Sequence, residues 1–427
     1  HSVSTEEGSL IWNTFVSRSK SLYDTLTSDN NEKIKGEIFH NKYLKVPSNL
    51  AKPLKNYDQN LEHKNRNLLF KKRKPSAAIY NSFWNTMGGG EKHALSLAKI
   101  LSKDYEIYLL SESDFDENKL KSYFSIKFKF RKFISSKIDS KTTSCFDLFV
   151  NSTYNSRIVS FCPKSLYLVS FPHKYASKKF LKSYLFLHNS IYTKNWAIKY
   201  WGRHRNTILY PITELKTFRK RNKVNDHKFY NQKRNIISIG RFSNNGHEKK
   251  QDFILKAFKK ALSVTKSDFN LFLIGSLDYT RREDLNFYNK LEKMKNEKIH
   301  LFPNLEFSKL NNLLSISKFY IHATGVDKNP KDNPELFEHF GISIIEALLS
   351  DNYPIVFNIG GPAYTVKLTN IGETFTDFES LVQILIRIFQ KPSIEKYNFI
   401  NNPLEPFLEK NNFSLKYIEN YLSESNN

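Results

Sequence analysis

Two glutamates, Glu338 and Glu346, lie eight positions apart on either side of a glycine that opens an apolar stretch. Isoleucine and leucine recur at helical spacing after Gly341, so we expect a helix to begin there. The start of a helix presents free backbone N–H groups and a partial positive charge, which suit a phosphate. One carboxylate precedes the turn and the other lies one turn inside the helix, so both can accept hydrogen bonds from hydroxyl groups of the same ligand.

The same segment also has a purely structural interpretation. Ser343 and Glu346 have the spacing of a capping box, in which the glutamate only satisfies a backbone N–H group of its own helix. Glu338 can equally be a solvated acid in a loop. Taken alone, the segment leaves both interpretations open.

A group of cations follows the strand predicted at 235–240. It contains Arg241 and Lys249, with Lys250 as an alternate. An arginine fork and a lysine point charge are the usual pair for neutralising a diphosphate, although a chain with 66 basic residues brings such pairs together by chance. Position supports the hypothesis, because the carboxyl ends of strands in one domain share one crevice and these cations can converge there with the glutamates.

Three consecutive glycines, Gly88 to Gly90, lie between a predicted strand and a predicted helix. They match neither the dinucleotide fingerprint nor a Walker loop. They form either a flexible turn or a place where a ligand or the opposite domain approaches the backbone closely. Asp114-Phe115-Asp116 matches a metal-binding DxD pattern, but it has no partner cluster and a solvated loop is the favoured interpretation. No metal site is expected.

Short apolar runs alternate with helical stretches twice along the chain, which predicts parallel sheets covered by helices on both faces. The first series has strands at 77–82, 105–110, 146–150, 166–170 and 184–188, with a helix over 94–101. The second has strands at 235–240, 270–275, 299–302, 319–323 and 354–358, with helices over 252–262, 283–296, 305–315, 343–349 and 378–389. The predicted fold class is α/β, with two Rossmann-like, doubly wound domains facing across a cleft.

These patterns divide the chain into successive parts. Residues 1–74 are expected to be a basic N-terminal extension, either helical or a linker, and residues 75–211 a first Rossmann-like domain. Residues 212–404 are expected to form the second such domain, and a C-terminal helix near 405–425 to pack back onto the first.

Composition excludes several classes of protein. The 427 residues exceed what one core usually supports, and two cysteines cannot form a disulfide framework, so a two-domain protein of a reducing compartment is expected. No apolar run approaches the length of a membrane span. The net charge of +24 fits a solvated lysine-rich surface, or attraction to an anionic membrane or a phosphate-bearing acceptor. Nucleic-acid binding is not expected, because no nucleic-acid-binding motif accompanies the charge.

The segment from Glu338 to Leu348 resembles the E-x7-E motif of glycosyltransferase family 4, the retaining enzymes of GT-B fold. Four other segments resemble landmarks of that family, in the same order along the chain: Gly88–Glu91, Asn189–Thr193, Gly240–Phe242 with Lys249, and Gly360–Pro362. The resemblance covers residues 77 to about 390.

The resemblance implies a role for each matched residue. Glu338, Arg241 and Lys249 would be the catalytic set. In donor binding, Glu338 would lie beside the sugar and Glu346 at the ribose. The other donor-binding residues would be Gly89, Gly90, Arg241, Lys249 or its alternate Lys250, and the amides of Phe340, Gly341 and Ile342. His173 would lie on the acceptor side. It follows the Phe-Pro pair, whereas relatives often carry a histidine before it, so a core or surface histidine is the alternative.

The implied function is retaining transfer of a hexose from a nucleotide-diphosphate sugar, GDP- or UDP-linked, without a cofactor. Mannose is the sugar that the family favours. The second domain would bind the donor, and the first a glycan or lipid-linked acceptor in surface-polysaccharide or glycoconjugate synthesis. The protein would be cytoplasmic, with peripheral contact to an anionic inner membrane face. The alternatives are a non-catalytic GT-B scaffold, or an epimerase or phosphorylase of the same fold.

Overall fold

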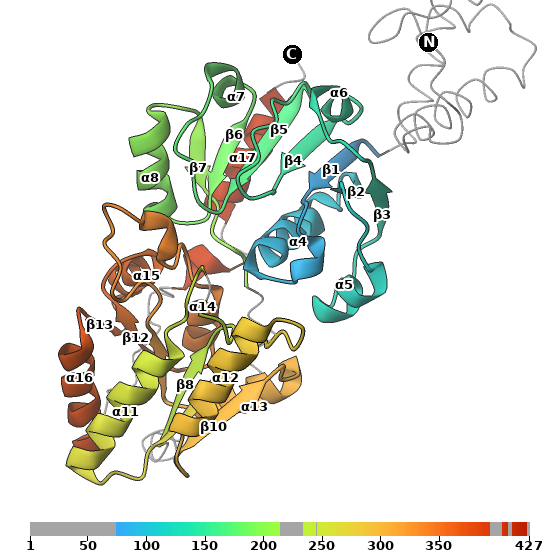
Figure 1. The fold of residues 1–427 in the computed structure, drawn as a ribbon. Coiled ribbons are helices and arrows are strands. Elements are labelled where there is room, and N and C mark those ends of the chain that lie inside the picture. The colour runs from blue at the N-terminus through green and yellow to red at the C-terminus, as the bar shows by residue number, and fades with distance from the viewer. Residues whose placement is uncertain (1–73, 214–233, 245, 393–403, 409–411, 425–427) are drawn as a thin grey trace, which may run out of the picture. The chain divides into compact units, whose positions relative to one another are not determined.

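The computed structural model describes residues 74–213, 234–244, 246–392, 404–408 and 412–424 (Figure 1). By packing, the chain divides into two compact units. Of the described residues, one unit contains those from 74 to 167 together with Ser177–Tyr184, and the other contains Leu168–Ala176 and those from Leu185 onward. The predicted N-terminal extension lies outside the described residues, apart from Lys74.

The first sheet has seven strands in the described part of the chain, in the order β3-β2-β1-β4-β5-β6-β7. The strands are β1 (Ser76–Tyr80), β2 (Glu106–Ser111), β3 (Phe130–Ile134), β4 (Leu148–Asn151), β5 (Lys164–Val169), β6 (Leu185–His188) and β7 (Asn206–Ile208). Every residue of β1, β4 and β6 is buried. Fully buried apolar strands are typical of a parallel sheet with both faces covered, as predicted from the sequence.

Helices connect the strands of this sheet. They are η1 (Trp84–Thr86), α4 (Gly89–Leu101), α5 (Glu117–Tyr123), α6 (Ser140–Thr143), α7 (Lys178–Lys182) and α8 (Ile191–Trp201). Helix α4 buries Ala94, Leu97, Ala98 and Leu101, the stripe on which the sequence prediction of this helix rests.

The second sheet has six strands among the described residues, in the order β10-β9-β8-β11-β12-β13. They are β8 (Asn235–Ile239), β9 (Asn270–Gly275), β10 (Ile299–Pro303), β11 (Phe319–His322), β12 (Tyr353–Phe357) and β13 (Glu373–Phe375). Its helices are α11 (Gln251–Thr265), α12 (Arg282–Met294), α13 (Phe307–Ile316), η2 (Pro334–Leu336), α14 (Ile342–Leu349), α15 (Gly361–Thr369) and α16 (Phe378–Gln390). The second α/β series predicted from the sequence is confirmed.

Two apolar cores lie on opposite faces of the second sheet. Ile236 and Ile237 are neighbours in β8, yet the first joins the core formed with α11 and α16 and the second joins the core formed with α14. Successive side chains of a strand point to opposite faces, so each central strand supplies both cores. This packing fixes β8 and β11, whose carboxyl ends carry the residues of the site.

The chain ends with η3 (Glu405–Phe407) and α17 (Asn412–Glu424). The guanidinium of Arg205, next to β7, lies over the Tyr421 ring of α17, 5.4 Å from its centroid. Among the described residues, no helix combines the length and the apolar character that a membrane crossing requires.

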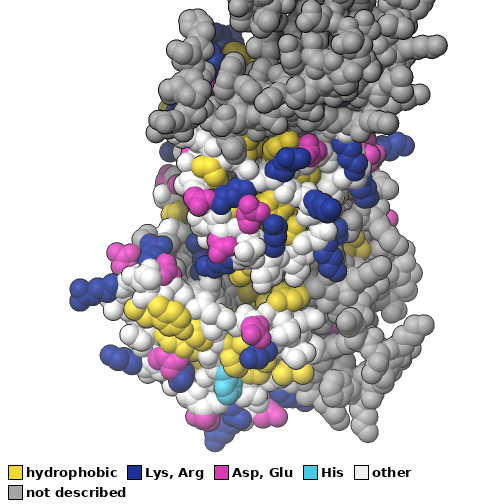
Figure 2. Space-filling view, turned by 90° about the vertical axis from the view of Figure 1, so that its right-hand side faces the viewer, with side chains coloured by type: hydrophobic (Ala, Val, Ile, Leu, Met, Phe, Trp, Pro, Cys, Tyr) yellow, Lys and Arg dark blue, Asp and Glu magenta, His cyan; other side chains and the backbone are white. Residues whose placement is uncertain are grey.

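Basic and acidic side chains are interspersed on the face shown in Figure 2. Among the coloured residues of this face, hydrophobic side chains form groups between the charged ones, and the basic side chains do not merge into one unbroken field. Lys127, Lys129 and Arg131 are exposed in and just before β3, at the edge of the first sheet. Charged side chains on an edge strand discourage pairing with another chain, so this part of the basic charge has a structural explanation.

Candidate active site at the carboxyl ends of β8 and β11

The strand order of the second sheet reverses direction between β8 and β11, which pair directly with each other. In open α/β sheets, a ligand binds outside the carboxyl ends of the strands at such a reversal. Arg241 follows β8, His322 ends β11, and the loop after β11 leads to Glu338. The topology therefore brings both predicted groups of residues to one edge of the sheet.

Because Gly240 has no side chain, Lys249 can pack against the end of β8. A Cβ atom on Gly240 would lie 2.4 Å from Cγ of Lys249, so the lysine stem packs where a side chain would otherwise be. The Nε2 atom of Gln251 donates hydrogen bonds of 2.9 Å to the carbonyls of both Gly240 and Arg241. The glycine and the glutamine together fix the backbone that positions Arg241 and Lys249.

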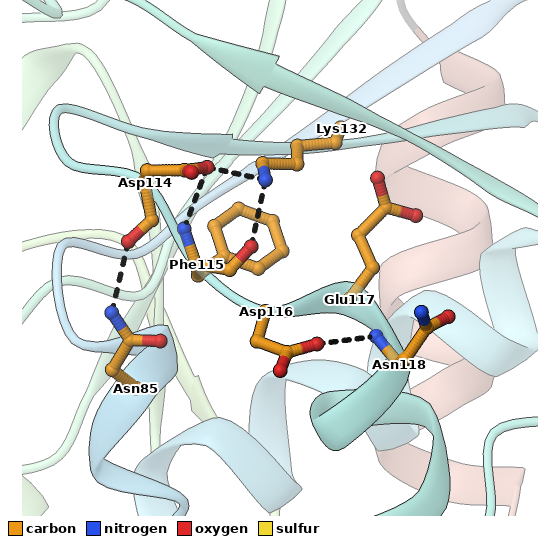
Figure 3. Close-up of a pocket in the computed structure, with 7 residues that line it drawn as sticks. All are labelled: Asn85, Asp114, Phe115, Asp116, Glu117, Asn118 and Lys132. Carbon is orange, nitrogen blue, oxygen red and sulfur yellow. Dashed lines mark hydrogen bonds and ion pairs between the residues drawn. The ribbon is translucent and has the colours of Figure 1, made fainter.

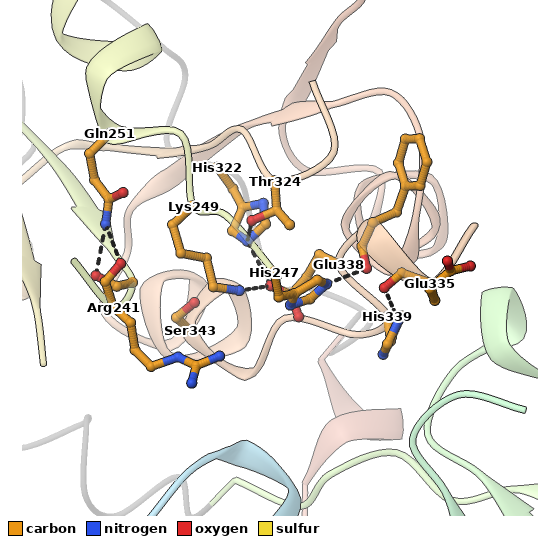
Figure 4. A network of polar contacts seen from close by, with 12 residues as sticks. Arg241, His247, Lys249, Gln251, His322, Thr324, Glu335, Glu338, His339 and Ser343 are labelled. Atoms are coloured by element: carbon orange, nitrogen blue, oxygen red, sulfur yellow. Dashed lines mark hydrogen bonds and ion pairs between the residues drawn. The ribbon is translucent and has the colours of Figure 1, made fainter. Parts of the chain in front are cut away.

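Lys249 and Glu338 form a largely buried ion pair, shown in Figure 4. Their side chains are only 16% and 15% exposed, and Nζ of Lys249 donates to Oε2 of Glu338. Nε2 of His322 lies 3.1 Å from the same oxygen. An ionised carboxylate only accepts hydrogen bonds, so His322 donates through a proton on Nε2.

The charges of this group follow from burial and pairing. Burial alone would raise the pKa of Glu338, but the Lys249 ammonium and the hydrogen bond from His322 outweigh it and hold that pKa well below its ordinary 4.5. Burial lowers the pKa of His322, and Glu338 only partly opposes this effect. At neutral pH Glu338 is therefore an ionised carboxylate and His322 a neutral imidazole.

Two further histidines support the backbone around Glu338. Nε2 of His247 donates to the carbonyl of Phe337 over 2.5 Å, and Nε2 of His339 donates to the carbonyl of Glu335 over 3.0 Å. Burial lowers the pKa of His247 to about 4 and that of His339 to about 3, so both rings are neutral. The ring of Phe171 stacks on His339 with 4.6 Å between the centroids.

Glycines allow the loop of Glu338 to turn into α14. Gly341 precedes the helix with φ of +87°, in the left-handed region that favours glycine. The N–H of Gly361 donates to the carbonyl of Glu338 over 2.7 Å, and a Cβ atom on Gly360 would lie 2.6 Å from that oxygen. The start of α15 is thus packed directly against the backbone of Glu338.

The capping-box interpretation of Ser343 and Glu346 is wrong. Gly341 is the N-cap of α14, with no side-chain hydrogen bond to the helix start. Ser343 lies inside the helix, and its hydroxyl is 2.7 Å from the hydroxyl of Tyr320. Glu346 is buried at 7% exposure one turn further on. Its predicted contact with a ribose stays a prediction.

The remaining predicted residues have different surroundings. Arg241 is exposed, and its guanidinium forms no ion pair with the described residues. Lys250 points to other acids, with Nζ 2.8 Å from Glu248 and 3.8 Å from Asp327. The structure therefore pairs Glu338 with Lys249, and not with the alternate Lys250.

His173 lies beside Trp201. The two rings are 5.1 Å apart, and the carbonyl of His173 accepts a hydrogen bond of 2.7 Å from the indole of Trp201. These contacts do not test the predicted role of His173 on the acceptor side, which stays a prediction.

The glycine loop after β1 is closed by Glu91. Gly88 is the N-cap of α4, and its N–H donates to Oε2 of Glu91 over 2.7 Å. The hydroxyl of Thr86 donates to the same oxygen over 2.7 Å, and Asn81 donates to the other over 3.2 Å. Gly89 and Gly90 are therefore the first helical residues, and their predicted role at the phosphate stays a prediction.

The DxD carboxylates have structural partners (Figure 3). Asp116 is the N-cap of α5 and accepts hydrogen bonds of 2.9 Å from the N–H groups of Asn118 and Lys119. Asp114 is 80% exposed and forms an ion pair with Lys132. Both aspartates line a hollow of about 570 Å³. In the part of the chain that the structure describes, no three His, Cys, Asp or Glu side chains are grouped as a metal site requires.

Residues 219–402 match the family model of glycosyl transferases group 1. This stretch contains all the residues of the candidate site in the second sheet. A curated relative, GDP-Man:Man(3)GlcNAc(2)-PP-Dol alpha-1,2-mannosyltransferase of Xenopus laevis, is 27% identical over 182 residues. The alignment covers 41% of this chain and 34% of the relative, so the chain matches about a third of that protein's length. The mouse protein of the same name is 27% identical over 195 residues, 43% of this chain and 36% of the relative.

Solved structures extend the similarity over most of the chain. A glycosyltransferase from Rickettsia africae superposes with a TM-score of 0.60 at 16% identity, covering 82% of this chain and 99% of that one. Anabaena Alr3699/HepE, solved in complex with UDP and glucose, gives 0.57 at 13% identity, covering 82% and 99%. The chain therefore has the GT-B fold predicted for it. Membership of family 4 stays a prediction.

Three residues of the site are not predicted from the sequence: His247, His322 and His339. His322 falls within the strand predicted at 319–323, where a single histidine is usually a core residue. Its position at the carboxyl end of a central strand is the sign that could have identified it.

Proposed function

We propose that this chain is a retaining glycosyltransferase that moves a hexose from a nucleotide-diphosphate sugar to a glycan or lipid-linked acceptor. The observation that carries the proposal is the buried Lys249–Glu338 pair at the reversal point of a sheet that matches group 1 glycosyl transferases. A solvated loop acid would not be held in this way, because burying an ion pair requires compensating partners.

Departure of a nucleoside diphosphate places negative charge on its phosphates. Arg241 and Lys249 would neutralise that charge, together with the N–H groups at the start of α14. Arg241 is exposed and can turn to a ligand, whereas Lys249 is fixed against Gly240. A preorganised cation needs little rearrangement when the charge develops, so we assign the larger catalytic effect to Lys249.

Glu338 would lie beside the transferred sugar and Glu346 beside the ribose of the nucleotide. The Lys249 ammonium and His322 keep Glu338 ionised, so it can accept hydrogen bonds from sugar hydroxyls and stabilise positive charge at the anomeric carbon. Retention of configuration is inferred from the resemblance of the E-x7-E segment to family 4.

GDP-mannose is the favoured donor, because the curated relatives are named as GDP-Man-dependent mannosyltransferases. UDP-glucose is the next candidate, since the structural neighbour HepE was solved with UDP and glucose. A lipid-linked acceptor is likewise proposed from the PP-Dol acceptor in the relatives' name, and such an acceptor would bring the protein to a membrane surface.

A panel of nucleotide sugars tests the proposal. The full chain is incubated with GDP-mannose, UDP-glucose and their isomers, with and without lipid-linked oligosaccharide, and release of the nucleoside diphosphate is measured. We expect one donor to be consumed, faster with acceptor present. A scaffold would leave all donors intact, and an epimerase would change the sugar without releasing the nucleotide.

A further inference from the structure

The two oxygens of Glu338 have different surroundings. Oε2 accepts from Nζ of Lys249 and from Nε2 of His322, whereas Oε1 accepts no hydrogen bond from the residues that the structure describes. The two oxygens of a carboxylate can together accept about four hydrogen bonds. One oxygen is thus occupied by the protein, and the other is open to a ligand.

His322 is more deeply buried than either partner. It is the last residue of β11, a central strand paired with both β8 and β12, and it is 3% exposed. Its Nδ1 atom has no hydrogen-bond partner among the described residues, so the hydrogen bonds of the ring run through Nε2, to Glu338 and, at 3.4 Å, to Thr324. A donor on a strand fixes its partner more accurately than a donor on a loop.

Lys249 alone would position the Glu338 carboxylate less securely during the reaction. The proposed function gives its ammonium a second anionic partner, the donor diphosphate. When the diphosphate arrives, Lys249 is shared between two anions. His322, which is neutral and buried, has no such second partner and would keep Glu338 in place.

We propose that His322 is a positioning residue that holds Oε2 of Glu338, so that Oε1 is presented to a hydroxyl group of the donor sugar. This inference rests on the proposed function. It predicts that His322 acts on the sugar part of the donor and not on the nucleotide part. A histidine that only fills the core would affect the two parts alike, through stability.

Two polar substitutions separate these roles. The amide nitrogen of glutamine falls near the position of Nε2 of histidine, and that of asparagine near Nδ1. His322→Gln therefore keeps a donor for Glu338 and His322→Asn loses it. His300→Asn is the matched control, because His300 is partly buried on β10 of the same sheet, among Phe272 and Phe302, far along the strand order from β11.

The measurements use the full chain with GDP and GDP-mannose, and with UDP and UDP-glucose. Calorimetry gives the affinity for each, and nucleotide release gives kcat and KM for the donor that is consumed. We expect His322→Asn to lower kcat about 10- to 100-fold, the scale of a misplaced catalytic group, while affinity for the free diphosphate changes less than about twofold. His322→Gln should retain at least about a third of the wild-type rate, and His300→Asn should match the wild type.

Two results would overturn the inference while leaving the proposed function intact. One is an active wild type with His322→Asn as fast as His300→Asn. The other is a His322→Asn variant that loses affinity for the free diphosphate and for the sugar donor in equal measure, with a lowered melting temperature. A wild type that consumes none of the donors contradicts the proposed function itself.

Discussion

Two loops carry acidic residues at the carboxyl ends of parallel strands, and they use their carboxylates in opposite ways. After β2, Asp116 caps α5 and Asp114 is 80% exposed. After β11, Glu338 is 15% exposed and shares one oxygen between Lys249 and His322. The first loop caps a helix, whereas the second keeps an ionised carboxylate buried and oriented. Burial with a matched cation, and not the spacing of acids, marks the place where chemistry is expected.

Among the described helices that begin at a glycine, α4 and α14 differ in the same sense. Glu91 turns back onto the N–H of Gly88 and closes the start of α4. Gly341 starts α14 with no side-chain cap. A helix start closed by its own carboxylate has fewer free N–H groups for an anion than one without a cap, so we expect α14 to be the better phosphate site.

Removing the buried cation Lys249 is expected to give the largest effect, and it tests whether the site around Glu338 carries the chemistry. We expect Lys249→Ala to reduce the rate of donor consumption roughly 10²-fold or more, because a fixed positive group opposite the leaving diphosphate is lost. Arg241→Ala should also reduce the rate. Steady-state kinetics with the donor that the nucleotide-sugar panel identifies measure both effects.

Lys260→Ala is the control for that experiment. Lys260 is an exposed residue of α11 that pairs with Glu379, so its removal should leave the rate near the wild-type value. Normal kinetics in a folded Lys249→Ala variant would show that Lys249 is not part of the active site.

The buried histidines around Glu338 predict a pH dependence of stability in mildly acidic solution. Burial lowers the pKa of His339 from its ordinary 6.5 to about 3. Below pH 6.5 the unfolded chain takes up a proton at this ring and the folded chain does not, so stability is full above 6.5 and falls as the pH drops toward 3. Glu338, whose pKa is lowered, adds to the loss only below its ordinary 4.5.

Urea unfolding of the wild type and of His339→Gln at pH 7.5 and pH 5.0 measures this dependence. The glutamine can still donate to the carbonyl of Glu335 but does not titrate. The loss of unfolding free energy between the two pH values should be smaller in the variant by about 2 kcal/mol. Equal losses would show that His339 does not titrate with folding.

Gly341→Ala sharpens the comparison of the helix starts. Its φ of +87° is strained for alanine, and the new Cβ would lie 2.6 Å from Cδ1 of Ile344. We expect a loss of about 1–3 kcal/mol, with a lower rate because the start of α14 shifts. Gly246→Ala is the matched control, since its φ is +68° with nothing within 4 Å of the new Cβ. If thermal melting and rates fall equally in both variants, the packing at Gly341 has no special role.

The smallest effect is expected in the DxD loop. Asp116→Ala should lower the unfolding free energy by about 1 kcal/mol, the usual effect of losing an N-cap, with the rate of donor consumption within about twofold of the wild type. Chemical unfolding and the donor assay check the two parts. A loss of rate like that of Lys249→Ala would show that this loop does act on the substrate.

The apolar patterns predicted most of the fold, because buried parallel strands and amphipathic helices follow directly from residue type. They did not predict β3 (Phe130–Ile134), β7 (Asn206–Ile208) or β13 (Glu373–Phe375). Strand β3 has arginine and lysine between its two phenylalanines at the sheet edge and buries only Phe133, so it has no buried run. The other two strands have three residues each. Pairing with a neighbouring strand defines these three elements more than their own composition does.

The candidate site was predicted in part. Glu338 and Lys249 were predicted as members of one site, but 89 positions separate them, and only the fold shows that their side chains meet. Lys249 and Lys250 are adjacent and chemically alike, and the backbone turn between them directs one to Glu338 and the other to Glu248. The histidines were not predicted, because a hydrogen bond between distant segments leaves no pattern in a single sequence.

Binding of a nucleoside diphosphate is the most direct test of the claim that Lys249 and the start of α14 hold a pyrophosphate. Melting temperatures of the wild type and of Lys249→Ala are measured with and without GDP and UDP, since a ligand bound only by the folded state stabilises it. We predict that one diphosphate raises the melting temperature of the wild type and that the variant loses most of this shift. No shift with either diphosphate, or an equal shift in both proteins, would contradict the account.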